Sequence, residues 1–243
     1  MDYNKTFEKR CHAYTYAVRT YPRSLEHEFR TAVNQLNIQT TDQILNIPAS
    51  CIELKQYFTV DPAGLYEFET NEAFASLTNM PVCSFFDIPL KDKSLTKIIS
   101  LASLHHMTYD ERPRFYEECK RLLQKDGSLI IGDVLKGSQQ DIWLNGYVAK
   151  NNSMGHNGFF WNEDDCKLLE KHGFKTTYNI QEYTWDFLNG RDMVDFVKNL
   201  FGLDLATDED ISKNVETYLT LKHTDKGISI DWKLCYICAT LDP

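Results

Sequence analysis

The sequence predicts an α/β fold in which a mostly parallel sheet is flanked by helices. Residues 95–134 follow the pattern strand, amphipathic helix, strand, which is typical of a βαβ unit in a parallel sheet. The second of these strands contains the apolar run 129–131 (Leu-Ile-Ile), as expected for a strand buried on both faces. Residues 42–61 have the layout of a first βα unit, in which two short apolar runs are separated by a turn and followed by an acid.

The composition indicates one large domain. The chain has 243 residues, of which 42% are hydrophobic and 13% aromatic, and this supports a sizeable core. A net charge of −9 argues against general attraction to nucleic acid or to an anionic membrane. The first residues lack a signal-peptide core, and no run approaches the ~18 apolar residues of a membrane span. We therefore expect a soluble, cytoplasmic protein.

We expect this single domain, residues 1–243, to have four parts. Two helices within residues 1–38 form an N-terminal helical cover, and they are separated at Tyr21-Pro22 because proline disfavours a helical residue before it. The other parts are a core (42–185), a helical insertion (190–222) and a final strand (228–241).

Strands and helices alternate along the core. We expect strands at residues 43–47, 58–61, 82–87, 95–101, 128–134 and 174–185. We expect helices at residues 71–77, 109–123, 139–150 and 162–172, and two more at residues 191–201 and 208–221. The connection between the first two strands is short, because a crossover between parallel strands usually needs a dozen or more residues.

Four segments carry a family resemblance. They are Thr59-Val-Asp-Pro62, Phe86-Asp-Ile-Pro-Leu90, residues 97–106 (Lys-Ile-Ile-Ser-Leu-Ala-Ser-Leu-His-His) and residues 118–133 (Glu-Cys-Lys-Arg-Leu-Leu-Gln-Lys-Asp-Gly-Ser-Leu-Ile-Ile-Gly-Asp). In their order and spacing they resemble the class I S-adenosylmethionine-dependent methyltransferases of the small-molecule type, and Gly173-Phe174 matches the usual start of that family's sixth strand. The resemblance implies a three-layer, Rossmann-like methyltransferase fold with a mostly parallel seven-stranded sheet, an antiparallel last strand and an N-terminal helical cover.

The resemblance implies S-adenosylmethionine as the cofactor and S-adenosylhomocysteine as its product. In that family the acid at the end of the second strand binds the ribose hydroxyls, and this role falls to Asp61 here. The acid after the third strand contacts the adenine amino group, and this role falls to Asp87. The other cofactor contacts that the resemblance implies are Asn46, Pro48, Ala49, Ser50, Ile88, Leu101, Ala102 and His105.

The first motif departs from the family pattern, which has an acid and several glycines after the first strand. This chain has Asn46-Ile-Pro-Ala-Ser-Cys51 there, so the motif is degenerate. Asn46 cannot make a charge-assisted contact, Pro48 lacks an N–H group, and Ala49 and Ser50 carry Cβ atoms where close approach is wanted. Either the cofactor binds in a modified way or the chain has lost it, and we expect retention because the rest of the binding set is present.

Two histidines are candidate catalytic residues, His106 and His156. His106 follows the fourth strand, at the edge where ligands bind in such sheets. In the alternative interpretation, one imidazole of the His105-His106 pair packs under the cofactor and does not act as a base. His156 lies in a segment rich in glycine and asparagine, where an imidazole can act as a general base; the alternative is a solvated loop. The expected substrate contacts are Asp133, Tyr16, Asn157 and Phe160.

The first functional hypothesis is methyl transfer from S-adenosylmethionine to a small molecule. The altered first motif motivates a second hypothesis, a methyltransferase-fold enzyme that catalyses a cyclisation, an elimination or a rearrangement. The third is a non-catalytic binding subunit that has lost the cofactor. We expect no nucleic acid or membrane partner, and a homodimer is left open.

No metal site is predicted. Cys235 and Cys238 form the only CxxC pair, and residues three apart on a strand face opposite sides, so the two thiols do not share a zinc ion.

Overall fold

The computed structural model describes residues 3–50 and 53–242, and these residues form a seven-stranded sheet. The strands are β1 (Gln43–Asn46), β2 (Gly64–Glu67), β3 (Leu95–Leu101), β4 (Leu123–Asp133), β5 (Phe174–Phe187), β6 (Leu221–Thr224) and β7 (Gly227–Leu241). The strands β2, β1, β3 and β4 pair in parallel in this order. β7 then pairs antiparallel with β4, β5 and β6. The predicted mostly parallel sheet with an antiparallel last strand is confirmed.

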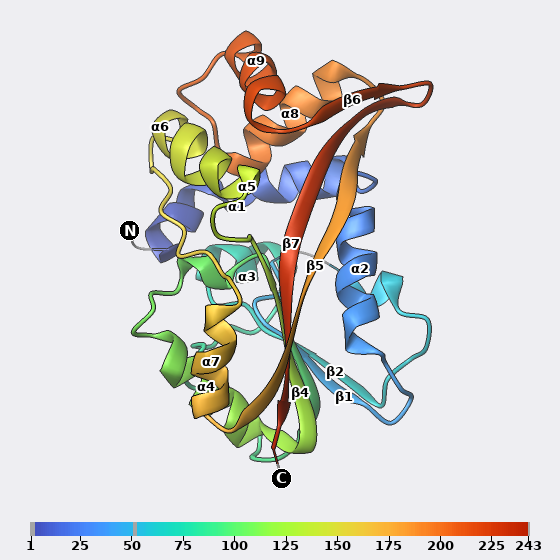
Figure 1. The fold of residues 1–243 in the computed structure, drawn as a ribbon, viewed down its shortest axis with the longest axis vertical. Coiled ribbons are helices and arrows are strands. Elements are labelled where there is room, and N and C mark those ends of the chain that lie inside the picture. The colour runs from blue at the N-terminus through green and yellow to red at the C-terminus, as the bar shows by residue number, and fades with distance from the viewer. Residues whose placement is uncertain (1–2, 51–52, 243) are drawn as a thin grey trace.

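Helices lie on both faces of the sheet (Figure 1). They are α1 (Tyr3–Thr20), α2 (Glu26–Leu36), α3 (Glu72–Thr78), α4 (Arg112–Leu122), α5 (Gln139–Ile142), α6 (Ala149–Asn151), α7 (Asp164–Lys171), α8 (Gly190–Phe201) and α9 (Asp208–Tyr218). The shorter helical turns are η1 (Leu54–Tyr57), η2 (Leu104–His106) and the π-helical η3 (Trp143–Val148). Among the described residues, none of these helices is long and apolar enough to cross a membrane.

Alternate residues of the central strands fill two separate cores, which makes the fold three-layered. Ile98 and Leu129 pack in the cluster that holds the apolar face of α4 and α7. Ile99 and Ile130, one residue further along each strand, pack in the cluster that holds α2. Cys235 belongs to the first cluster and Cys238 lies against the second, so their thiols face opposite sides of β7 as expected.

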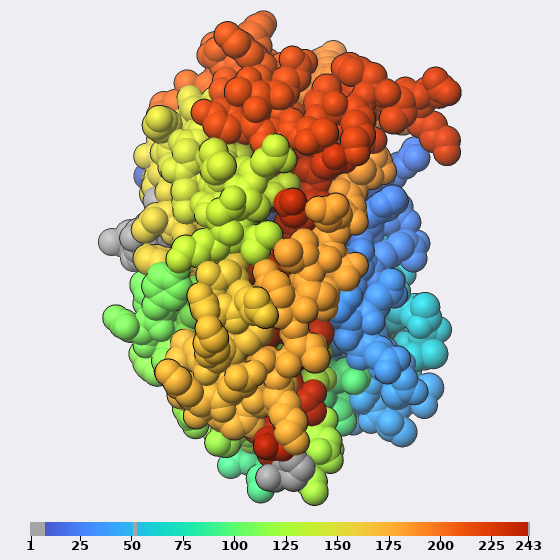
Figure 2. Space-filling model, in the orientation of Figure 1, coloured from blue at the N-terminus to red at the C-terminus, as the bar shows by residue number. Residues whose placement is uncertain are grey.

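A group of helices covers the end of the sheet at which the parallel strands finish. In Figure 1, α1, α5, α6, α8 and α9 gather beyond that end, and β5 and β7 extend up among them. Hydrogen bonds join α1 to α8: Tyr16 Oη donates to Asp195 Oδ2 at 3.0 Å, and Arg10 donates to the Leu200 carbonyl at 3.0 Å. The space-filling view shows the segments around α5 and α9 as one continuous surface over this end (Figure 2).

The predicted second strand was wrong. Residues 58–61 lie outside the sheet, because the 3₁₀ turn η1 runs up to Tyr57 and Pro62 cannot donate to a ladder. The ladder with β1 begins instead at Gly64, whose N–H donates to the Asp42 carbonyl at 3.1 Å. The acid that ends the second strand is therefore Glu67.

The predicted strand at residues 82–87 is also wrong. Only an isolated parallel bridge joins Val82 to Glu69. A tight turn then bends the chain away from the sheet, since Asp87 N–H donates to the Ser84 carbonyl at 3.3 Å and Phe86 N–H donates to Ser84 Oγ at 3.1 Å.

Candidate active site

Asp133, the last residue of β4, organises the loop that follows the neighbouring strand β3. Its side chain is fully buried and accepts from the His105 backbone N–H at 2.9 Å, from His105 Nδ1 at 2.8 Å and from the Val134 N–H at 2.7 Å. A carboxylate only accepts hydrogen bonds, so Nδ1 of His105 carries the proton and Nε2 is left as an acceptor. The adjacent Ala102 turns the chain out of β3 with a left-handed φ of 48°.

His156 reaches the same place from the segment between α6 and α7. Its Nδ1 lies 3.1 Å from Oδ1 of Asn145, which is part of the π-helical turn η3. Asn145 also donates to the Gly158 carbonyl at 3.0 Å and accepts from the Gly158 N–H at 2.8 Å. An amide oxygen is an acceptor, so Nδ1 of His156 also carries its proton and Nε2 is left as an acceptor.

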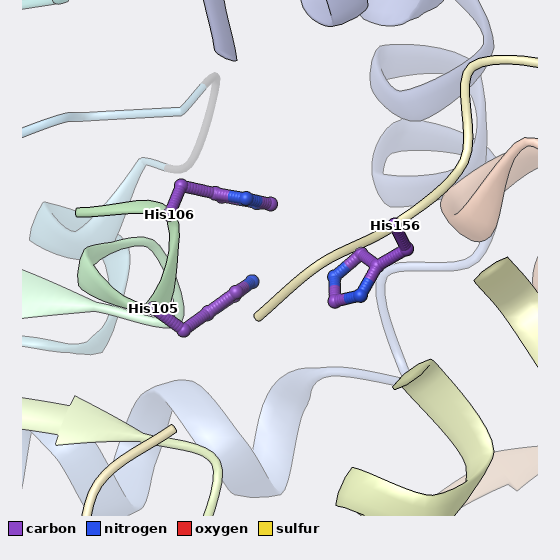
Figure 3. Close-up of side chains that lie close together, drawn as sticks. All are labelled: His105, His106 and His156. Carbon is purple, nitrogen blue, oxygen red and sulfur yellow. The ribbon is translucent and has the colours of Figure 1, made fainter. Parts of the chain in front are cut away.

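Three imidazoles meet at the end of the sheet (Figure 3). The ring centroids of His105 and His106 are 4.1 Å apart, and that of His156 lies 5.6 Å from His105 and 5.5 Å from His106. One ligand atom of each ring lies within 4.8 Å of the others. The sequence placed His105 and His106 at this edge, and the structure adds His156 to them.

Burial keeps two of these rings neutral. It lowers the pKa of His106 well below its ordinary value, and it lowers the pKa of His156 to about 3, with the neighbouring His105 and the Arg10 guanidinium acting in the same direction. A base with such a pKa accepts a proton weakly at neutral pH. These histidines are therefore better suited to hydrogen bonding or to coordination through a lone pair than to proton abstraction.

The three histidines line a cavity of about 100 Å³. Its other walls are largely apolar and aromatic, and they come from the helices that cover the end of the sheet, from the long strands β5 and β7, and from the ends of β3 and β4. They include Tyr14, Leu25, Phe29, Leu101, Ala102, Val134, Leu144, Leu200, Phe201, Trp185, Trp232 and Leu234. Two charged residues, Arg10 and Glu28, complete the lining. A larger groove of about 570 Å³, beside the β6–β7 turn, contains none of the predicted site residues.

Glu28 is a site residue that sequence reasoning missed. It lies on α2 and is only 4% exposed, and it accepts from Trp185 Nε1 at 3.0 Å. Burial raises the pKa of Glu28 to about 7, and the charge of Asp133 adds to the rise, while hydrogen bonds from Trp185 and Tyr183 oppose it. An acid on an amphipathic helix carries no signal of burial in the sequence, because charged residues are ordinarily exposed.

The turn after β1 forms the adjoining edge. Asn46 is buried, and its Nδ2 donates to Oε1 of Glu67 at 3.2 Å. The Ile47–Pro48 peptide is cis, and the Ala49 N–H donates to the Phe68 carbonyl at 2.9 Å. Ser50 has a left-handed φ of 50°. Glycine usually occupies such a position, and this turn adopts the conformation without one. Cys51 lies outside the described residues.

Comparison with known proteins identifies this architecture. Residues 49–131 match the family model described as a methyltransferase domain. The chain has the Rossmann-like methyltransferase fold. No curated protein matches the chain in sequence.

Several solved structures share the methyltransferase fold at low sequence identity. A candidate methyltransferase from Bacillus halodurans is 14% identical, with a TM-score of 0.61 over 89% of this chain and 100% of that one. An S-adenosylmethionine-dependent methyltransferase from Thermotoga maritima is 16% identical, with a TM-score of 0.58 over 98% of both chains. The [4+2]-cyclase SpnF is 13% identical, with a TM-score of 0.55 over 89% of this chain and 80% of that one. At such identities the likeness concerns the fold alone.

Within the methyltransferase fold, the acids expected at the cofactor edge lie in exposed loops. Asp61 is exposed and pairs with Lys55 at 3.5 Å, away from any strand end, because the second strand begins after it. Asp87 is also exposed. Ile88 is buried in the core, and its N–H donates to Glu118 Oε1 at 2.6 Å. The acid at the end of β2 is Glu67, which could have been found if the strand had been placed correctly.

The expected substrate contacts do not all lie near the three histidines. Phe160 is buried, and its ring lies 5.3 Å from that of His105 and 6.0 Å from that of His156. Tyr16 points instead toward α8 and does not line the cavity, and Asn157 is exposed. The structure therefore brings together Asp133, Phe160 and the three histidines, but Asp133 and Phe160 lie behind the histidines and do not line the cavity.

Proposed function

We propose that the chain is an S-adenosylmethionine-dependent methyltransferase that acts on a small molecule. The observation that carries the proposal is the position of the cavity. It shares Leu101, Ala102 and His105 with the edge at which the family resemblance places the cofactor. An acceptor in the cavity would thus lie next to that edge, and at about 100 Å³ the cavity suits a small acceptor group.

The residues that end β1 and β2 fit the ribose of the cofactor. Glu67 ends β2, where a carboxylate can accept from both ribose hydroxyls, and Asn46 holds it from the end of β1. Burial raises the pKa of Glu67, and the hydrogen bond from Asn46 opposes that rise, which favours the accepting carboxylate. When bound, S-adenosylmethionine supplies an activated methyl group, so the protein mainly has to align the acceptor.

The cavity walls supply this alignment. Asp133 fixes the ring of His105, and Asn145 fixes that of His156, so both imidazoles present Nε2 in a set orientation. Glu28, with a pKa of about 7, is the group in the cavity best placed to exchange a proton with an acceptor near neutral pH. The aromatic walls exclude water from the transfer.

Calorimetry and a labelled cofactor test this proposal. We expect the purified chain to bind S-adenosylmethionine and S-adenosylhomocysteine, and to transfer label from the methyl group to a small molecule in a cell extract. The Glu28→Gln variant should bind S-adenosylhomocysteine as the wild type does and transfer methyl more slowly. Binding of neither ligand would contradict the proposal and favour a non-catalytic subunit.

A non-methylating reaction is the second candidate. It is favoured by the altered turn after β1 and by the fold likeness to a [4+2]-cyclase. Mass spectrometry separates the two, because methyl transfer adds one methyl group to the substrate, whereas a cyclisation or rearrangement leaves its mass unchanged.

A further inference from the structure

We propose that His105, His106 and His156 form a binding site for one divalent transition-metal ion of the kind that imidazole prefers, such as Zn²⁺. The three rings come from two segments about fifty residues apart, and one ligand atom of each lies within 4.8 Å of the others (Figure 3). Zinc binds imidazole nitrogen at about 2.0–2.1 Å, so a tetrahedral ion holds its nitrogens about 3.4 Å apart. Ring rotations that move the nitrogens by about an ångström close the remaining gap.

The groups behind the rings support this assignment. A metal-binding histidine usually donates its other ring N–H to a carboxylate or a carbonyl, which fixes both the tautomer and the orientation of the ring. His105 donates to Asp133 in this way at 2.8 Å, and His156 donates to Asn145 Oδ1 at 3.1 Å. On both rings Nε2 is therefore the atom available to a metal.

The ligand set also determines which ions fit. Three neutral imidazoles without a carboxylate suit Zn²⁺, Co²⁺ or Ni²⁺, whereas Mg²⁺ and Ca²⁺ require oxygen ligands. Three protein ligands leave a coordination position open, as in catalytic rather than structural zinc sites. All three histidines line the cavity, so this position opens into it.

The open position would give the metal a role in methyl transfer. This role rests on the proposed function. An acceptor hydroxyl, thiol or amine in the cavity would bind the ion through its lone pair, and this would lower its pKa and hold it in place. Metal binding itself does not depend on methyl transfer, and it is tested separately.

The test is a titration of the 243-residue chain with Co²⁺, after chelator treatment and dialysis. Visible absorption follows the binding, and Zn²⁺ is then added in competition. We expect one equivalent of Co²⁺ to bind, to be displaced by Zn²⁺ and to be unaffected by Mg²⁺. His106→Ala and His156→Ala should each weaken binding at least 100-fold. Asn145→Ala should weaken it about 10-fold, since it removes only the group that orients His156.

His223→Ala is the matched control, because His223 is exposed on β6, and it should bind as the wild type does. Circular dichroism confirms that each variant is folded. No stoichiometric binding by the wild type, or unchanged binding by folded His156→Ala, would overturn the proposal.

Calorimetry with S-adenosylhomocysteine on the same samples separates the two proposals. A chain that binds Co²⁺ but no S-adenosylhomocysteine has the metal site and lacks the proposed cofactor. The opposite result rejects the metal site alone.

Discussion

Asp133 accepts two hydrogen bonds from the same residue, one from the backbone N–H of His105 at 2.9 Å and one from its ring Nδ1 at 2.8 Å. The end of β4 thereby fixes both the loop after β3 and the direction of the imidazole that it carries. The next residue, Val134, donates to the same carboxylate at 2.7 Å. Three donors thus depend on one buried acid.

Asp133→Asn should destabilise the protein by about 2–3 kcal/mol, because an amide has one accepting oxygen and its NH₂ group would face a buried N–H. Urea unfolding measures the loss. Asp110→Asn is the control, since Asp110 is exposed, and it should change stability by less than about 0.5 kcal/mol. Equal stability of the two variants would mean that Asp133 does not hold the loop.

Arg112 anchors the segment that carries His156. It is fully buried and donates to Asp165 and to the Phe159 carbonyl, and its guanidinium lies 3.8 Å from the ring centre of Trp161. Arg112→Lys keeps the charge and loses the planar fork and the stacking, so we expect a loss of about 3 kcal/mol in unfolding free energy.

Arg19→Lys, at an exposed position of α1, is the control for Arg112→Lys and should have no measurable effect in the same urea titration. If Arg112→Lys were as stable as the wild type, the planar fork and its stacking on Trp161 would not be needed to hold this segment.

Glu28 should make the protein less stable as the pH rises. Its pKa is about 7 in the folded protein against an ordinary value of 4.5, so the folded state favours the protonated form. The contribution to stability is complete below pH 4.5 and is lost as the pH rises through about 7, because the buried carboxyl must then ionise. The loss is up to roughly 3 kcal/mol.

Glu28→Gln stays neutral and should remove this dependence, so its stability relative to wild type grows between pH 4.5 and about 7 and is constant above that. Its amide oxygen still accepts from Trp185. Unfolding titrations at a series of pH values measure the difference, and Glu209→Gln, which is exposed, should run parallel to the wild type. A constant difference between Glu28→Gln and wild type would show that Glu28 does not titrate in this range.

The central strands were predictable because their apolar runs are long. β3 was expected at residues 95–101 and is found there, and its partner β4 ends within one residue of the expected position. β2 was missed because Gly64-Leu-Tyr-Glu67 is short and mixed in polarity, and it pairs only with β1 at the edge of the sheet. Residues 58–61 have more β-forming side chains, but the turn before them and Pro62 after them exclude that segment from the ladder.

The site was predictable in part, for a related reason. His105 follows a strand directly, so its place at the sheet edge could be inferred from sequence. The meeting of His156 with His105, and the burial of Glu28, depend on how the helical cover packs, and local sequence patterns do not specify this. The proposed metal-ligand set could not be predicted, because its members have no characteristic spacing along the chain.

Ala102 offers a test of backbone strain at the site. Its left-handed φ of 48° is unfavourable for a residue with a Cβ atom, at a cost of about 1 kcal/mol or more. Ala102→Gly should therefore raise the unfolding free energy by up to about 1 kcal/mol, because relief of this strain outweighs the entropy that glycine adds to the unfolded chain. Ala149→Gly, in α6, is the opposite case and should lower stability by about the same amount. If both variants lost stability, Ala102 would not be strained.

The acid that ends the second strand is the one expected to bind the ribose of the cofactor. Glu67 lies at that position and is held by Asn46, whereas Asp61 lies in an exposed loop. A hydrogen bond to a charged group is worth about 1.5–3 kcal/mol, so Glu67→Gln should weaken S-adenosylhomocysteine binding about 10- to 100-fold. Asp61→Asn removes a charge of the same sign and should leave the dissociation constant within about twofold, because its carboxylate faces solvent.

Calorimetry on this matched pair measures both changes directly. If Asp61→Asn lost affinity while Glu67→Gln kept it, the loop before β2 would have to close over the ribose. Asp61 would then be the ribose-binding acid, as the sequence predicts. If both variants bound as the wild type does, neither acid would contact the ribose, and the edge between β1 and β2 would not be the cofactor site.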